Sequence, residues 1–351
     1  MPLPLPRLIP PLVTALLGAA LLPAATAQPQ AAAVPVKAIK TNLAEESFQT
    51  MVVNRALQEL GFAVQPILEA DLTAAYLAIA NGDATYTAVN WWPLHQGMYE
   101  KAGGDRVFFR QGVFIDGGAQ GYLIDRKTAT EHRITNLAQL KDPAIARLFD
   151  HDGNGKADLT GCNPGWGCEL AIEHQLSAYG LRETVEHRQG NYNALMADTL
   201  ERFRAGQPIL YYTWTPYWVS GVLRPGQEVS WLEVPFTALP DLSGDVKQAR
   251  TTLPDGKNYG FPIAREHIVA NRRFAQQHPA AAKLFEIARI PIADINAQNL
   301  RMQQGENSPA DLQRHTEAWI QANRATFDSW LQQARAAQAQ AQKAPTQRQR
   351  P

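Results

Sequence analysis

Three tryptophans of the sequence lie beside turn-forming residues, and this placement points to recognition of a cation. Trp91 precedes a Trp-Pro pair, Trp166 lies between two glycines, and Trp214 comes two residues before Pro216. Proline and glycine favour turns, and loops carry binding residues more often than packed elements do. The face of an indole ring attracts a quaternary ammonium group. If these loops converge, the three indoles form an aromatic cage; the alternative is that each ring fills a hydrophobic core.

An anion site is predicted at the start of the helix that follows the second of these tryptophans. Residues 169–179 have a helical pattern, so the backbone N–H groups of Gly167 and Cys168 lie at or near a helix N-terminus. Such N–H groups, together with the helix dipole, favour a carboxylate. His95, on the loop after Trp91, is a hydrogen-bond donor that suits the same anion. The alternative for His95 is an ordinary surface histidine.

The first 27 residues have the features of a secretory signal. Arg7 is their only charged residue, an apolar run covers residues 12–22, and small residues at 25–27 end it. This pattern predicts cleavage after Ala27 and an exported protein. The apolar run is shorter than the roughly 20 residues that span a bilayer. No cysteine directly follows the predicted cleavage site, so we expect no lipoprotein anchor.

Cys162 and Cys168 are the only cysteines of the chain. In an exported protein an isolated even pair is expected to form a disulfide; two free thiols are the alternative. Closing so short a loop would contribute roughly 2–3 kcal/mol in the chain-entropy account. Its main effect would be to shape the segment that carries Trp166.

Just before this loop, residues 150–158 match part of a calcium-binding loop. Oxygen donors occupy its first, third, fifth and ninth positions, a glycine occupies the sixth, and a backbone carbonyl would serve at the seventh. The twelfth position, which calls for glutamate, is Gly161. The segment therefore predicts either a structural cation, Ca²⁺, or a turn held by its own Asp and Asn side chains. The candidate ligands are Asp150, Asp152, Asn154, Lys156 and Asp158.

Length and element order predict two α/β lobes. A chain of 351 residues exceeds the size at which single cores stop growing, about 250–300 residues. Between residues 36 and 89, strand patterns alternate with helical ones, which indicates a largely parallel sheet with ligands beyond the carboxyl ends of its strands. We expect a first lobe of residues 36–122 and about 260–334, and a second lobe of residues 123–259. Helices are predicted over residues 136–149 and 311–334, among others, and the Ala/Gln-rich tail, 335–351, is expected to be disordered.

Charge and motifs favour a binding protein over an enzyme. The chain has 33 basic and 33 acidic residues, so no basic face indicates nucleic-acid binding. No nucleophile elbow, zinc-protease motif, Walker loop or dinucleotide-binding glycine pattern is present in the sequence. We therefore expect no catalytic residue and no organic cofactor. An extracytoplasmic enzyme acting on betaine or choline compounds remains the rival class.

Five segments of the sequence carry a resemblance to a known family. They are Thr87-Ala-Val-Asn-Trp91, Pro93-Leu-His95, Lys156-Ala-Asp-Leu-Thr-Gly-Cys-Asn-Pro-Gly-Trp-Gly-Cys168, Tyr211-Tyr-Thr-Trp-Thr-Pro-Tyr-Trp-Val219 and Ala293-Asp-Ile-Asn-Ala-Gln-Asn299. These segments resemble the family of periplasmic glycine betaine/proline betaine-binding proteins of osmoprotectant ABC importers. The resemblance runs from about residue 41 to about residue 334, nearly all of the predicted mature chain.

The resemblance implies a type II periplasmic-binding fold, with two α/β lobes around a ligand cleft. It also implies that a trimethylammonium group is boxed by three indoles and that its carboxylate is held by a loop histidine and two backbone amides. The sequence departs from the family pattern at Trp92, where a smaller polar residue is expected. The positions that match the family's site are Trp91, His95, Trp166, Gly167, Cys168 and Trp214.

The implied ligand is glycine betaine or a related quaternary ammonium carboxylate such as proline betaine. The implied partners are the membrane permease and ATPase subunits of an ABC importer, and the protein itself is expected to be a monomer. Within the binding proteins, the alternative is a choline or carnitine receptor. Choline lacks a carboxylate, so it would leave the predicted anion site without a partner.

Overall fold

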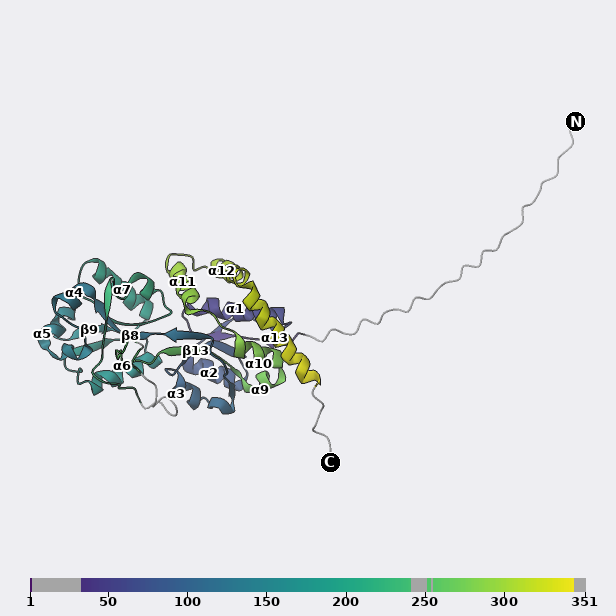
Figure 1. Cartoon of the computed structure of the whole chain (residues 1–351), viewed down its shortest axis with the longest axis horizontal. Helices are drawn as coiled ribbons and strands as arrows, with labels where there is room; N and C mark the ends of the chain where they lie inside the picture. Colours follow the sequence, from purple (N-terminus) through teal and green to yellow (C-terminus); the bar gives the residue numbers. More distant parts are fainter. Residues whose placement is uncertain (2–32, 241–250, 254, 344–351) are drawn as a thin grey trace, which may run out of the picture. The chain divides into compact units, whose positions relative to one another are not determined.

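Two β-sheets organise the chain from Val34 onward (Figure 1). The computed structural model describes residues 1, 33–240, 251–253 and 255–343. Apart from its first residue, the predicted signal peptide lies outside these described residues. The last eight positions of the predicted tail, 344–351, lie outside them as well.

The five-stranded sheet comes from the middle of the chain, and we call the part built on it the second lobe. Its order is β10-β9-β11-β8-β12. The first three of these strands are parallel, whereas β8 is antiparallel to both of its neighbours. The strands are β8 (Gln120–Asp125), β9 (Ala157–Thr160), β10 (Val185–Arg188), β11 (Leu210–Trp214) and β12 (Val229–Leu232).

The other sheet joins the beginning of the chain to its later part, and we call the part built on it the first lobe. Its central strand is β13 (Ala264–Asn271), which is antiparallel to β5, β6 and β7. Short parallel pairs, β1 with β3 and β2 with β4, accompany this sheet. The remaining strands are β1 (Pro35–Val36), β2 (Ile39–Lys40), β3 (Ala63–Val64), β4 (Leu68–Glu69), β5 (Tyr86–Trp92), β6 (Phe108–Phe109) and β7 (Ile115–Gly118).

The prediction of a largely parallel sheet is wrong for the first lobe. Among the described residues its parallel pairing is limited to the two short pairs and a bridge between Ala38 and Tyr86. The strand–helix alternation over residues 36–89 reports only local elements. It cannot reveal that β13, from much later in the chain, inserts beside β5 in the opposite direction.

Helices pack around both sheets, and Figure 1 shows those of the second lobe on the left and those of the first lobe on the right. The second lobe contains α4 (Arg126–Glu131), η2 (Leu137–Lys141), α5 (Pro143–Ala146), η3 (Arg147–Phe149), α6 (Gly167–Ala178), α7 (Tyr192–Arg204) and α8 (Val219–Val222). The first lobe contains α1 (Glu46–Glu59), α2 (Leu72–Asn81), α3 (Gln96–Lys101), η1 (Gly104–Arg106), α9 (Arg272–Gln277), α10 (Pro279–Ile287), α11 (Ile292–Gln303), α12 (Pro309–Ala322) and α13 (Arg324–Lys343).

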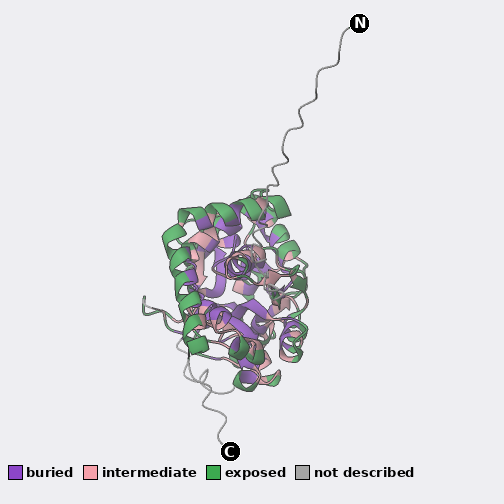
Figure 2. Cartoon of the chain, turned by 90° about the vertical axis from the view of Figure 1, so that its right-hand side faces the viewer, coloured by how far each residue is buried: buried purple, intermediate pink, exposed green. Residues whose placement is uncertain are grey.

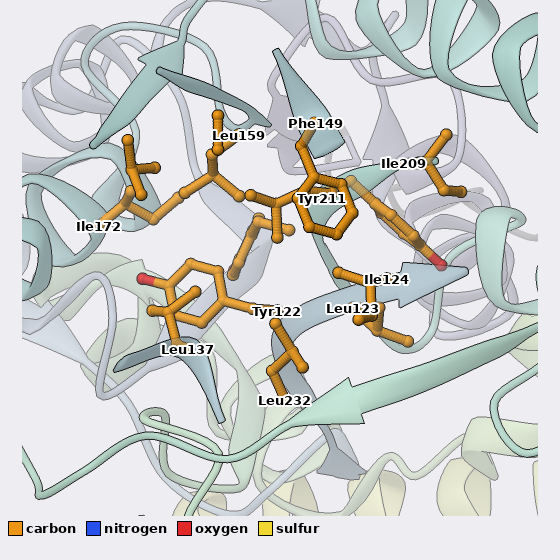
Figure 3. Packing of buried hydrophobic residues seen from close by; sticks show 14 of the residues in the cluster. Tyr122, Leu123, Ile124, Leu137, Phe149, Leu159, Ile172, Ile209, Tyr211 and Leu232 are labelled. Atoms are coloured by element: carbon orange, nitrogen blue, oxygen red, sulfur yellow. The ribbon is translucent and has the colours of Figure 1, made fainter. Parts of the chain in front are cut away.

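Each lobe has its own buried core. In the second lobe Tyr122, Leu159 and Tyr211 come from neighbouring strands and are fully buried members of one hydrophobic cluster, which Figure 3 shows. In the first lobe Tyr86 of β5 packs its ring against Phe285 of α10, with ring centroids 5.0 Å apart. Figure 2 shows buried strand residues inside and exposed helix faces outside. The two clusters are separate, so each lobe has a core of its own.

Two predicted helices differ in the structure. The stretch 136–149 is three short helices, because Pro143 has no N–H to continue a helix and instead begins α5. The stretch 311–334 is two helices that meet at Asn323. The Ser308 side chain accepts from the N–H of Asp311 and caps the first of these, so α12 begins before residue 311.

The predicted disordered tail is wrong for residues 335–343, which continue α13. This helix buries Phe327, Trp330 and Leu331 against the first-lobe core. Alanine and glutamine have high helix propensity, so the exposed end extends a helix that packing has already nucleated. Across the part of the chain that the structure describes, no helix combines the length and apolar character that crossing a membrane requires.

Candidate ligand-binding site

One open cleft, with an empty volume of about 750 Å³, is lined by residues of both lobes. The structure brings all six predicted ligand-binding residues to its walls. They are Trp91, His95, Trp166, Gly167, Cys168 and Trp214.

The second-lobe wall is a packed aromatic cluster. The Trp166 and Trp214 rings meet edge to face, with centroids 6.0 Å apart and planes at 76°. Trp214 also lies 4.8 Å from the Tyr192 ring and 4.4 Å from the Tyr217 ring, centroid to centroid. Trp214 is the last residue of β11, and Trp166 is the N-cap of α6. The end of a strand and the start of a helix therefore fix both indoles.

The first-lobe wall contributes Trp91, near the end of β5. Within the described residues it makes no ring pair with Trp166 or Trp214, although all three indoles line the cleft. A Cβ atom on Gly118 would lie 3.0 Å from the Trp91 ring, so glycine allows the indole to lie close to β7. Trp92 does not line the cleft, because side chains alternate between the two faces of a strand. It is paired with Arg265 of β13.

The N-terminus of α6 presents two backbone donors to the cleft. Gly167 and Cys168 are the first two residues of this helix, so their N–H groups have no intrahelical acceptor. No other acceptor for them is found among the described residues. A Cβ atom on Gly167 would lie 2.7 Å from the Leu94 side chain and from its carbonyl oxygen. Only glycine therefore lets this helix start approach the loop that carries His95.

His95 is buried beside these donors and is held as a neutral imidazole. Its Nδ1 accepts the backbone N–H of Trp91 at 3.2 Å and lies 3.5 Å from the Tyr76 hydroxyl. Burial lowers the pKa of His95 to about 4, with the Val89 carbonyl acting in the opposite direction. Because Nδ1 is an acceptor in this geometry, the proton is on Nε2. His95 can therefore donate one hydrogen bond from Nε2 at neutral pH.

The disulfide predicted from the cysteine pair is present and closes the loop that carries Trp166. The Cys162 and Cys168 sulfurs are 2.06 Å apart. A second support of this loop was not predicted. His187 Nε2 accepts the backbone N–H of Cys162 at 3.2 Å, and its Nδ1 lies 2.8 Å from Glu173 Oε1. The lowered pKa of His187, which burial causes, keeps Nε2 available as an acceptor.

Sequence reasoning missed the polar residues of the first-lobe wall. Three carboxyl groups line it, and burial raises the pKa of each, that of Glu46 to about 7. Asn299 of α11 donates to the Pro216 carbonyl at 3.2 Å and so joins the two lobes. These residues come from the start of α1, from β13 and from α11, and no local pattern marks them as neighbours. They are Glu45, Glu46, Glu266 and Asn299.

The 150–158 loop lies apart from the cleft and is held by internal bonds. The Asp150 carboxylate accepts the backbone N–H groups of Gly153, Asn154 and Gly155 at 2.8–3.1 Å. Asp158 is buried and is ion-paired with Arg188 at 3.1 Å. The Lys156 backbone N–H donates to the Asn154 side chain at 2.8 Å. The carboxylate oxygens of Asp152, Asp158 and Glu186 lie within 4.8 Å of one another.

Two α/β lobes around a cleft with ring faces and backbone donors define a solute-binding protein. Solved structures of this class share the fold. A lactococcal OpuAC in complex with glycine betaine has a TM-score of 0.64 at 19% identity, covering 85% of this chain and 99% of that one. An ABC-transporter choline-binding protein in complex with choline has a TM-score of 0.66 at 15% identity, covering 85% and 91%. The type II periplasmic-binding fold is therefore confirmed.

Sequence comparison gives the family. The profile described as the substrate-binding domain of the ABC-type glycine betaine transport system matches residues 34–322, and the chain belongs to this family. A "Glycine betaine/proline betaine-binding periplasmic protein" of Escherichia coli strain K12 is 58% identical over 305 residues, covering 87% of this chain and 91% of that protein. A "Glycine betaine-binding periplasmic protein OusX" of Dickeya dadantii is 58% identical over 304 residues, with the same coverage.

Proposed function

We propose that this protein captures glycine betaine, and also proline betaine, in the periplasm and delivers it to an ABC importer for osmoprotection. The observation that carries the proposal is the meeting of three indoles with two free helix amides and a neutral histidine in one cleft. The relatives named for glycine betaine binding support it. The proposed function includes no catalytic step, because it asks only that the cleft recognise a charged group at each end of the ligand.

The indoles of Trp91, Trp166 and Trp214 enclose the trimethylammonium group. Each ring face contributes about 0.5–2 kcal/mol to binding a cation, and more when water is excluded. The group has no N–H to donate, so an aromatic cage satisfies it without hydrogen-bond acceptors. Proline, with a secondary ammonium group, binds more weakly because its N–H donors find no acceptor in such a cage.

The ligand carboxylate is held at the start of α6. The N–H groups of Gly167 and Cys168 donate to it, and the N-terminal end of the helix dipole adds a favourable field. The Nε2–H of His95 supplies a third donor from the opposite lobe. Choline has no carboxylate and leaves these donors unpaired, which is costly in a buried site.

Binding stabilises closure of the lobes. Trp91 and His95 belong to the first lobe, whereas Trp166, Trp214 and the amides of α6 belong to the second, so only a closed state completes the site. The lobes divide as residues 36–119 with about 260–343, and residues 120–259, and not at the predicted residues 122 and 334, because β8 (Gln120–Asp125) belongs to the second-lobe sheet and α13 (Arg324–Lys343) to the first lobe. The protein acts as a monomer, is secreted by cleavage after Ala27, and delivers its ligand to the permease and ATPase subunits.

No organic cofactor is needed for this function. For the 150–158 loop, the ion pair of Asp158 and the backbone bonds of Asp150 support a turn held by its own side chains over a structural Ca²⁺. Thermal denaturation with Ca²⁺ and with a chelator tests this. A Ca²⁺-dependent rise in the melting temperature would favour the cation.

Isothermal titration of the mature protein at fixed salt tests the function. The ligands are glycine betaine, proline betaine, choline and proline. Tight binding of the two betaines with weak binding of choline and proline is the expected result. Tight choline binding would overturn the carboxylate site, and a reaction product from incubated betaine would favour an enzyme.

A variant pair strengthens this test. Trp166→Ala should lose most of the betaine affinity, because it removes one wall of the cage. Trp231→Phe is the matched control, since Trp231 lies in the same lobe, packs against Tyr259 and does not line the cleft. Equal loss in both variants would point to general damage of the second lobe.

A further inference from the structure

A buried carboxyl group lies in the first-lobe wall beside the Trp91 indole. Glu266 of β13 is paired with Trp91 of β5 in an antiparallel register. Residues opposite each other in such a pair have their side chains on the same face of the sheet. Glu266 lines the cleft, yet its relative exposure is 0%. The register therefore places a carboxyl group next to one wall of the proposed cage.

Among the described residues, no hydrogen bond of ordinary geometry reaches either carboxyl oxygen of Glu266, although the Gln49 side chain lies close enough to lower its pKa by hydrogen bonding. The nearby Gln49 amide donates to the Ala88 carbonyl at 3.0 Å. Burial raises the pKa of Glu266 well above its usual range. The Gln49 side chain lowers this pKa, whereas the nearby Glu46 carboxyl group raises it further. Buried polar groups in native proteins nearly always have a partner, and a buried charge is costly without one. A positive charge is therefore expected from the ligand to compensate the carboxylate of Glu266 when it is ionised.

The basic side chains near this part of the first lobe are engaged with other groups. The Lys40 ammonium bonds Glu69 at 2.6 Å and two backbone carbonyls. The Arg110 guanidinium donates to the Asn90 and Gln96 side chains and lies over the Tyr99 ring. Neither cation pairs with Glu266.

The other titratable groups around Glu266 do not supply a positive charge either. From α1, Glu45 and Glu46 are carboxyl groups, and burial raises the pKa of both. Tyr76 of α2 is uncharged at pH 7, because burial raises the pKa of its hydroxyl. His95, on the loop after β5, is neutral at pH 7 because burial lowers its pKa to about 4. His267, the next residue of β13, has its Nδ1 against the Gly112 carbonyl instead. The cleft therefore offers Glu266 no cation of its own.

We propose that Glu266 is a specificity-determining residue, whose carboxylate faces the quaternary ammonium group of the ligand beside Trp91. It selects ligands with a fixed positive charge over uncharged ligands of the same shape. This inference rests on the proposed function, because it assumes that the cage holds such a cation. It adds a charged contact to a cage that would otherwise act through ring faces alone.

The contact couples binding to a proton. In the empty cleft burial favours the protonated carboxyl group of Glu266. A quaternary cation placed beside it favours the ionised form, so the O–H bond breaks and the proton passes to solvent as the ligand binds. Affinity for a cationic ligand therefore rises with pH through the interval between the pKa of Glu266 in the complex and its higher pKa in the empty cleft.

The test compares two ligands that differ only in charge. Glycine betaine and 3,3-dimethylbutanoate share a carboxylate and a similar outline, but the second has a neutral tert-butyl group. Both are titrated calorimetrically into the unsubstituted protein, Glu266→Gln and Glu317→Gln. Glu317 is the matched control, because it lies on α12 of the same lobe, is half exposed and pairs with Arg55. We expect Glu266→Gln to weaken betaine about tenfold, an effect of about 1.4 kcal/mol, without weakening the neutral ligand.

Titrations in buffers of different ionisation enthalpy count the protons released. Release on betaine binding that disappears in Glu266→Gln and persists in Glu317→Gln supports the inference. An equal loss of both ligands in Glu266→Gln, or no loss of either, overturns it while leaving the proposed function in place. If the unsubstituted protein binds no betaine at all, the proposed function fails and this inference fails with it.

Discussion

The second-lobe wall of the cleft is a packed aromatic cluster, whereas the first-lobe wall combines a single indole with buried polar groups. Trp214 and Trp166 contact each other and neighbouring tyrosines, so they are held in place without a ligand. Trp91 instead has Glu266 beside it, a buried carboxyl group that no described cation pairs with. The comparison indicates that one wall is preformed and that the other is completed by the ligand.

The largest effect should distinguish the two indole walls. Trp214→Ala and Trp91→Ala are each expected to weaken betaine binding by about 100-fold, since each removes a cation–π contact and opens the cage to water. Only Trp214→Ala should also lower the melting temperature markedly, because it removes a ring that packs on Tyr192 and Tyr217. Calorimetry and thermal denaturation measure the two effects. A comparable melting-temperature loss in Trp91→Ala would show that the first-lobe wall is equally packed.

The next effect concerns the approach of α6 to the first lobe. Gly167→Ala is expected to weaken betaine binding about tenfold, because its Cβ atom would lie 2.7 Å from Leu94 and push the helix start away from His95. Gly190→Ala is the matched control in the same lobe, since its Cβ atom would lie no closer than 3.7 Å to any neighbouring side chain. Titration of both variants with glycine betaine gives the comparison. Unchanged affinity in Gly167→Ala would contradict the close approach.

The disulfide should stabilise the second lobe more than it contributes to affinity. The double variant Cys162→Ser, Cys168→Ser is expected to lose about 2 kcal/mol of unfolding free energy, a value typical of short loops. Betaine affinity should fall only severalfold, because His187 still holds the Cys162 backbone. Urea denaturation followed by tryptophan fluorescence measures the first quantity. A loss of affinity without a loss of stability would reverse this assignment.

The smallest effect is a pH dependence in the first lobe. The pKa of His95 is about 4 in the folded protein, below its ordinary value of 6.5. The unfolded chain therefore binds a proton first as the pH falls below 6.5, so His95 costs stability between pH 6.5 and pH 4. From pH 7 to pH 5, the His95→Gln variant should gain about 1–2 kcal/mol relative to the unsubstituted protein. Denaturant titrations at both pH values measure this difference, and a constant difference would mean that His95 is not held neutral.

Local sequence determined the elements of the second-lobe wall. The helical pattern over residues 169–179 corresponds to α6 (Gly167–Ala178), which begins two residues earlier and ends one residue earlier than predicted. The cysteine pair predicted the disulfide, because two cysteines in an exported chain have few other partners. The placement of Trp166 before a helix predicted its position at the N-terminus of α6. Each of these signals lies within a few consecutive residues.

Tertiary structure alone decided the first-lobe wall. Glu266 becomes the neighbour of Trp91 only because β13 enters the sheet antiparallel to β5. The carboxyl groups of α1 and the amide of Asn299 meet the cleft through packing of helices far apart in the sequence. The Ala/Gln segment to Lys343 is helical because α13 is anchored by Phe327, Trp330 and Leu331 against the core. Periodicity and turn signals in the sequence report local conformation, whereas strand register and burial depend on which surfaces meet in the folded chain. Burial in turn shifts the pKa values of the titratable groups in the first-lobe wall.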